Sequence, residues 1–244
     1  AWKSLLYWLG YSSREVDLVS LFLSSNLLKY LPGGIWHFVE RLRSLKIYMS
    51  AGKALASVLL EPLLMASAAM LWVPFGGFKT GLELLCILPA FCFFRPLREP
   101  LLGRLKKLKA NQLERLSLET RFTGNIDKFG IGRSPYPIKA FATEMLFILF
   151  RFGGFWCCVN AFHIGSTISF LEWLASFSLA WTIGLVVPAA PGGVGVFEAG
   201  LLISVAPSVP EAPLLASLLC YRLIATLADV LAAFFVSIRD QMMF

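Results

Sequence analysis

The segment VPAAPGGVGVFE, residues 187–198, interrupts a sequence that is otherwise apolar enough to lie within a membrane. Pro188 and Pro191 each remove a backbone hydrogen-bond donor, and three glycines follow: Gly192, Gly193 and Gly195. A continuous helix is therefore excluded. Backbone that is not helical at membrane depth is tolerated only where protein buries it or where it lines a water-filled cavity. We therefore expect a functional site at this break.

The composition indicates an integral membrane protein. Of the 244 residues, 57% are hydrophobic and 15% are charged, and the mean hydropathy is +0.71. In a soluble domain about a quarter of the residues are charged. The expected fold class is all-α, a polytopic membrane helix bundle in which residues 1–244 form a single transmembrane domain. No segment remains that resembles a soluble enzyme domain.

Metal, disulfide and cofactor roles are not expected. The five cysteines lie in apolar runs and have no Cys-X-X-Cys spacing: Cys86, Cys92, Cys157, Cys158 and Cys220. Only His37 and His163 could serve as histidine partners. We interpret the cysteines as small apolar residues of helices, and we predict no cofactor, no metal site and no catalytic residue.

The basic residues are concentrated in one loop. Residues 95–139 contain eleven Lys or Arg and four Asp or Glu, and so carry the whole net charge of +7. The positive-inside rule predicts that this loop is cytoplasmic. Its leucines recur at helical spacing among basic residues, which is typical of an interfacial amphipathic helix. Anionic lipid headgroups are the expected partner, rather than nucleic acid, and a solvated topology signal is the alternative.

The remaining chain divides into apolar helices. An apolar run at 16–31 precedes an amphipathic helix at 35–49, whose cluster of basic residues again indicates the cytoplasmic side. Membrane spans are expected at residues 54–73, 80–94, 138–162, 167–187 and 213–236. Because the sequence begins abruptly at Ala1, we also expect spans upstream of it.

Two parts of the chain resemble each other at an offset of 160 residues. LASVLLEPL at residues 55–63 aligns with LASLLCYRL at 215–223, and the same offset places Gly33 over Gly193. We predict an internal repeat with halves at about residues 16–74 and 167–236, each containing a Pro-Gly-Gly break. Chance similarity between leucine-rich segments is the alternative. The repeat could be parallel or inverted, and repeats with equivalent broken helices point to a transporter binding site.

The breaks favour phosphate as a ligand. A helix that begins after Gly34 or Gly195 presents unpaired amides and the positive end of its dipole. Arg151 and Arg222 lie within predicted spans, where a guanidinium can pair bidentately with phosphate. The structural alternatives are that Arg222 pairs with a carboxylate from another helix, Glu61 or Glu198, and that Glu198 stabilises the start of its own helix.

Several motifs together resemble a known family. They are NLLKYLPGGIW at residues 26–36, Glu61, PGGVGVFE at 191–198 and the pair Tyr221 and Arg222. In this order and spacing they are similar to the lysylphosphatidylglycerol synthase transmembrane-domain family, also described as flippase-like. The resemblance implies a bundle with broken or re-entrant helices in a bacterial inner membrane or its archaeal equivalent. It also implies translocation of lipids or lipid-linked sugars. Bifunctional members add a soluble domain for aminoacyl transfer, and no residues here resemble that domain.

The expected function is therefore the binding or translocation of an anionic phospholipid or lipid-linked sugar phosphate. The predicted substrate-binding residues are Pro32, Gly33, Gly34, Glu61, Arg151, Pro191, Gly192, Gly193, Gly195, Glu198, Tyr221 and Arg222. One alternative is an intramembrane enzyme that uses carboxylates such as Glu61, Glu198 and Asp229. Another is an accessory or scaffold subunit in lipid or envelope-glycan synthesis. Membrane lipids are the expected partners, and a homo-oligomer is left open.

Overall fold

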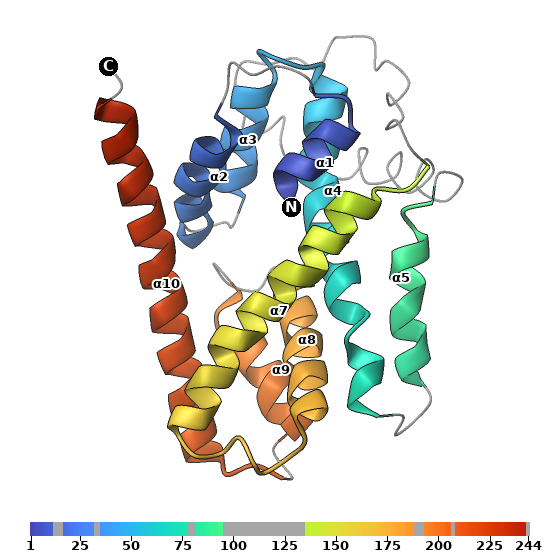
Figure 1. Cartoon of the computed structure of the whole chain (residues 1–244), viewed down its shortest axis with the longest axis vertical. Coiled ribbons are helices and arrows are strands. Elements are labelled where there is room, and N and C mark those ends of the chain that lie inside the picture. Colours follow the sequence, from blue (N-terminus) through green and yellow to red (C-terminus); the bar gives the residue numbers. More distant parts are fainter. Residues whose placement is uncertain are drawn as a thin grey trace.

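The computed structural model describes residues 1–11, 17–31, 35–77, 82–94, 135–187, 193–205 and 208–242. Within these ranges every regular element is helical, which confirms the predicted all-α class (Figure 1). The elements are α1 Trp2–Trp8, α2 Leu18–Asn26, η1 Leu27–Tyr30, α3 Trp36–Leu45, α4 Ala51–Met70, η2 Val73–Gly76, η3 Leu82–Ile87, α5 Leu88–Phe91, α7 Ile138–Ala161, α8 Phe170–Val186, α9 Val196–Val205 and α10 Glu211–Met242, where η denotes a 3-10 helix.

Three of these helices are long and apolar enough to cross a membrane. They are α4 with its 3-10 extension, Ala51–Gly76, together with α7 and α10. The spans predicted at 54–73, 138–162 and 213–236 correspond to them. The span predicted at 167–187 forms α8, a shorter apolar helix of 17 residues. The chain is thus an integral membrane protein with both long and short apolar helices.

The segment predicted as a span at 80–94 differs from the expectation. Its described part consists of the 3-10 helix η3 followed by the four-residue α5, rather than one continuous α-helix. Pro89 lies in the first turn of α5. A proline is accepted there because its missing N–H would have no partner in a first turn, whereas inside a helix it would break the hydrogen-bond ladder. The proline therefore marks a boundary between two short elements.

Two short helix pairs occupy opposite halves of the molecule (Figure 1). Helices α2 and α3 lie in the upper half of the view, and α8 and α9 lie in the lower half. Helix α4 runs downward from the upper half, whereas α10 runs upward from the lower half along the edge of the molecule. Helix α10 contacts both α2 and α9, so it connects the two halves.

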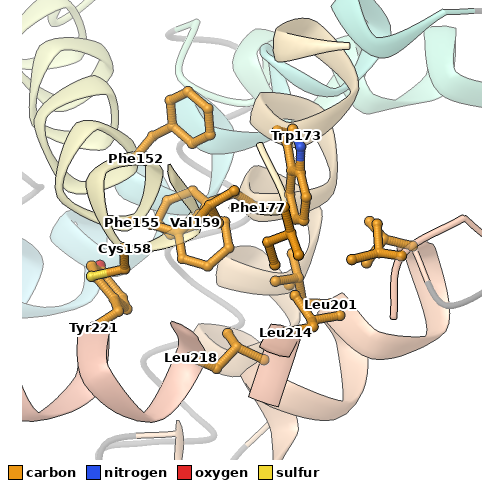
Figure 2. Packing of buried hydrophobic residues seen from close by; sticks show 14 of the residues in the cluster. Phe152, Phe155, Cys158, Val159, Trp173, Phe177, Leu201, Leu214, Leu218 and Tyr221 are labelled. Carbon is orange, nitrogen blue, oxygen red and sulfur yellow. The ribbon is translucent and has the colours of Figure 1, made fainter. Parts of the chain in front are cut away.

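An aromatic core holds the lower half together. Phe155 on α7 is stacked on Phe177 of α8, with 5.3 Å between ring centroids, and Tyr221 of α10 lies edge-on to both (Figure 2). Trp173 and Leu201 complete the fully buried centre. Each such aromatic pair contributes about 0.5–1.5 kcal/mol beyond the area that it buries. This core fixes α7, α8, α9 and α10 around the residues that follow the Pro-Gly-Gly segment.

Candidate functional site

The residues between α8 and α9, 187–195, are called the C-terminal break. Of the predicted site residues in it, Gly193 and Gly195 are described, whereas Pro191 and Gly192 lie outside the described residues. Gly193 has φ +68° and Gly195 has φ +87°, a region that residues with a side chain rarely adopt. A Cβ on Gly193 would lie 2.8 Å from the carbonyl oxygen of Gly184. Glycine is therefore required at Gly193 for the break to pack against α8.

Arg222 of α10 reaches across to this break. Its Nε lies 2.7 Å from Oε1 of Glu198, and its Nη2 donates to the Gly193 carbonyl at 2.9 Å. The other carboxylate oxygen of Glu198 accepts from the Gly195 amide at 2.7 Å. Both structural alternatives for Glu198 thus hold at once, since it pairs with Arg222 and satisfies an amide before its own helix. A carboxylate of the chain occupies the position that the sequence suggested for a phosphate oxygen.

Arg151 of α7 has a different environment. Its guanidinium lies over the rings of Phe147 and Trp181, 5.6 and 5.3 Å from their centroids. Its Nε is enclosed and has no hydrogen-bond partner, and no carboxylate in the described ranges pairs with it. Cation–π contacts stabilise a cation by about 0.5–2 kcal/mol, which does not replace a counter-ion at membrane depth. Within the part of the chain that the structure describes, Arg151 thus has aromatic contacts and no carboxylate partner.

Glu61 of α4 does not join Arg222 or Arg151. It instead pairs with Arg41 of α3, with 2.6 Å between Nη1 and Oε2, and the Nε of Arg41 donates to the Ser25 hydroxyl at 3.0 Å. The expectation that Glu61 positions one of the two site arginines therefore needs correction. From the sequence, Arg41 was counted among the basic residues of the amphipathic helix at 35–49, although Arg41 lies four residues before the buried Leu45, on the same helix face. That spacing was a usable signal for a buried arginine.

A polar cluster missed by reasoning from sequence surrounds Asp229 of α10. The Asp229 carboxylate accepts from Nζ of Lys29 at 2.7 Å, from the hydroxyl of Tyr30 at 2.8 Å and from Nδ2 of Asn26 at 3.2 Å. These three donors come from the end of α2 and from η1. They directly precede residues 31–35, called the N-terminal break. Its Pro32, Gly33 and Gly34 lie outside the described residues, and their predicted role stays a prediction.

Tyr221 is buried in the aromatic core and lies beside Cys158 (Figure 2). Its ring packs against Phe155 and Phe197, and its hydroxyl has no hydrogen-bond partner among the described residues. Tyr221 thus packs α10 against α7 and α8, at the position next to Arg222. The ring thus has a packing role here.

A cleft lies at the other end of α8 and α9. It has a volume of about 180 Å³, and its polar lining includes Glu83, Glu172, Ser176, Ser204 and Ser208. None of Gly193, Arg151 and Arg222 lines it. This cleft is therefore separate from the C-terminal break. Within the described ranges, no three His, Cys, Asp or Glu residues are grouped as a metal site would require.

A family model described as the lysylphosphatidylglycerol synthase TM region matches residues 2–233. The chain belongs to this family. The match covers nearly all of the 244 residues and agrees with the helices that are apolar enough to span a membrane. Membership associates the chain with membrane lipid synthesis and flipping. Comparisons with curated proteins and with solved structures found no match.

Proposed function

We propose that this protein binds an anionic phospholipid or a lipid-linked sugar phosphate and translocates it across the bilayer. The headgroup phosphate would lie between the two breaks, with Arg222 and Arg151 opposing its charge. One observation carries the proposal: Arg222 holds the C-terminal break through Glu198 and the Gly193 carbonyl, while Arg151 has no carboxylate partner among the described residues. A buried guanidinium and a phosphate form short, bidentate, charge-assisted hydrogen bonds.

The positions of the helices support an inverted repeat. At the offset of 160 residues, α3 and α9 begin at 36 and 196, and both have ten residues. With the same offset, α2 and α8 end at 26 and 186, and α4 and α10 begin at 51 and 211. Helices α4 and α10 run in opposite directions, which favours the inverted form over the parallel one (Figure 1). Inverted repeats with broken helices are a common architecture of transporters, with the substrate between the repeats.

The balance of charge at membrane depth favours an anionic substrate. Among the described residues, Lys29 pairs with Asp229, Arg41 with Glu61 and Arg222 with Glu198. Arg151 has no carboxylate partner in the described ranges. Glu144, seven residues before it on α7, is buried and also has no partner among the described residues. Seven residues along a helix correspond to about 10 Å, which is too far for a direct ion pair between Glu144 and Arg151.

The two alternatives are less well supported. An enzyme would need an acid and a base close together, yet Glu61, Glu198 and Asp229 each pair with a different cation, and no two of them share a partner. A scaffold would pair all its intramembrane charges, and Arg151 does not fit that expectation.

We also propose a bacterial inner membrane as the location, with the basic loop at residues 95–139 in the cytoplasm. The net charge of that loop supports this orientation through the positive-inside rule. Helix α7, which follows the loop, would then begin on the cytoplasmic side. The α8–α9 pair, which holds the C-terminal break, would then enter the membrane from the side opposite to the cytoplasm.

The test is translocation in liposomes that contain the purified protein and a fluorescent anionic lipid, followed by quenching the label that is exposed outside. Wild-type protein should move the lipid, Arg222→Ala should lose most of this activity, and Arg43→Ala, an exposed arginine on α3, should retain it. If Arg222→Ala is poorly folded by size-exclusion chromatography, Arg151→Ala replaces it with the same expectation. Equal translocation by wild type and the site variant, or none by wild type, would contradict the proposal.

A further inference from the structure

Three donors at the N-terminal break form a receptor for an anion. Nδ2 of Asn26, Nζ of Lys29 and the hydroxyl of Tyr30 converge on the two oxygens of the Asp229 carboxylate at 3.2, 2.7 and 2.8 Å. The 3-10 geometry of η1 brings Asn26 and Lys29 to one face, because residues three apart in such a helix are eclipsed, and Tyr30 follows directly after Lys29. An amide, an ammonium and a phenol thus point to one position, where they hold an anion.

The accessibility of this site resembles that of the C-terminal break. The side chains of Lys29 and Asp229 are 22% and 17% exposed, and those of Arg222 and Glu198 are 23% and 16% exposed. The Arg41–Glu61 pair, by contrast, is 2% and 6% exposed. An ion pair that is buried from solvent in this way, here called sealed, stabilises the fold. The pairs Lys29–Asp229 and Arg222–Glu198, called half-open because solvent reaches both partners, leave room for another anion to replace the carboxylate.

Both half-open pairs depend on α10. Arg222 and Asp229 are seven residues apart, which places them on one face of the helix and about 10 Å apart along its axis. Each of them contacts a different short helix pair. The other side of α10 carries exposed apolar side chains, among them Leu223, Leu227 and Phe235. Helix α10 therefore lies between the surrounding lipid and both sites, at the edge of the molecule (Figure 1).

We propose that Asn26, Lys29 and Tyr30 form a second headgroup site for a lipid phosphate, which the Asp229 carboxylate occupies in this structure. The inference rests on the proposed function and deepens it. Phosphate and carboxylate oxygens accept the same donors, and a lysine ammonium is a frequent phosphate ligand. When α10 withdraws Asp229, Lys29 loses the carboxylate that it pairs with and attracts the headgroup phosphate.

With the second site, the protein has two phosphate-binding sites of similar chemistry along the path of the headgroup. At the C-terminal break a phosphate would replace Glu198 on Arg222 and on the Gly195 amide. At the N-terminal break it would replace Asp229 on Lys29. The two breaks belong to short helix pairs in opposite halves of the molecule. The headgroup therefore passes from one site to the other, and in the absence of lipid a carboxylate of the chain occupies each site.

The test measures equilibrium binding of dioctanoyl phosphatidylglycerol to the purified full chain by isothermal titration calorimetry. Asp229→Asn removes the competing carboxylate and should tighten binding by about tenfold. The double variant Lys29→Gln/Asp229→Asn also lacks the ion pair but has no ammonium, and it should lose this gain. Asp17→Asn, which removes the carboxylate paired with Arg239 at the far end of α10, is the matched control and should bind like wild type.

Two further ligands identify the source of the phosphate group. Dioctanoyl phosphatidylcholine, whose headgroup is zwitterionic, should show no gain in Asp229→Asn, and inorganic phosphate should bind more weakly than the lipid. No gain in Asp229→Asn, a gain that persists in the double variant, or tighter binding of inorganic phosphate than of the lipid would overturn the second site. Failure of the proposed function would appear separately, as absence of wild-type translocation in liposomes.

Discussion

Arg41 on α3 and Glu61 on α4 form a sealed ion pair, with 2.6 Å between Nη1 and Oε2. The guanidinium also lies 4.2 Å from the ring centroid of Phe22 and 5.2 Å from that of Trp2. A pair that is fully desolvated is costly to separate, because removing one partner leaves an uncompensated buried charge. This pair stabilises the upper half of the molecule, whereas the half-open pairs on α10 are suited to exchange.

The first prediction concerns this pair. Glu61→Ala should destabilise the protein by about 3–5 kcal/mol, because Arg41 would be buried without its counter-ion. Reversible unfolding in detergent should measure the loss. The double variant Arg41→Met/Glu61→Leu should recover most of it, since both charges are then replaced by apolar groups of similar volume. A Glu61→Ala protein as stable as wild type would show that the pair is not sealed from water.

The second prediction concerns Gly193. Gly193→Ala should cost about 1–3 kcal/mol and should reduce translocation, since alanine is strained at φ +68° and its Cβ would lie 2.8 Å from the Gly184 carbonyl oxygen. The matched control is Gly153→Ala on α7, where a Cβ has no atom within 4 Å. That control should be neutral or stabilising, because alanine is the better helix residue. Equal stability of the two variants would contradict the tight packing of the C-terminal break against α8.

The third prediction concerns the aromatic core. Phe155→Ala removes a fully buried ring and should cost about 3–5 kcal/mol in the same unfolding measurement. Phe150→Ala, on the same helix with 73% of its side chain exposed, should cost far less. Similar losses in both variants would place the core elsewhere.

The fourth prediction tests the inverted arrangement. Tyr48 lies between α3 and α4, and Ser208, which is 160 residues later, lies between α9 and α10. In a protein whose own cysteines are replaced by alanine, Tyr48→Cys and Ser208→Cys should react with a membrane-impermeant maleimide from opposite sides of the membrane. Intact and permeabilised cells distinguish the two sides. Labelling of both cysteines from the same side would support a parallel repeat and contradict the inverted one.

Much of the fold could be predicted from the sequence, because hydrophobic length and proline position are local properties. The spans corresponding to α4, α7 and α10 are of this kind. The pair of Glu198 and Arg222 was one of two alternatives for Arg222, beside a pair with Glu61, and the structure has Glu198. The segment at 80–94 was harder to predict, since a short apolar run with an internal proline can form either one helix or two.

The buried ion pairs were harder to predict for a different reason. The four-residue spacing between Arg41 and the buried Leu45 showed that Arg41 could face inward, but one sequence does not show that Glu61 faces it. The contact between Lys29 and Asp229 joins residues 200 positions apart. It depends on how α10 packs against α2, which is a tertiary property that local periodicity does not encode.

The most direct test of the account is the lipid preference of the wild-type protein in liposomes. The initial rate of translocation should be measured for phosphatidylglycerol and for phosphatidylcholine that carry the same fluorescent acyl chain. The account predicts faster movement of phosphatidylglycerol, and it predicts that Arg151→Gln abolishes this preference because the unmatched cation is gone. Equal rates for the two lipids in wild-type protein would contradict the central claim.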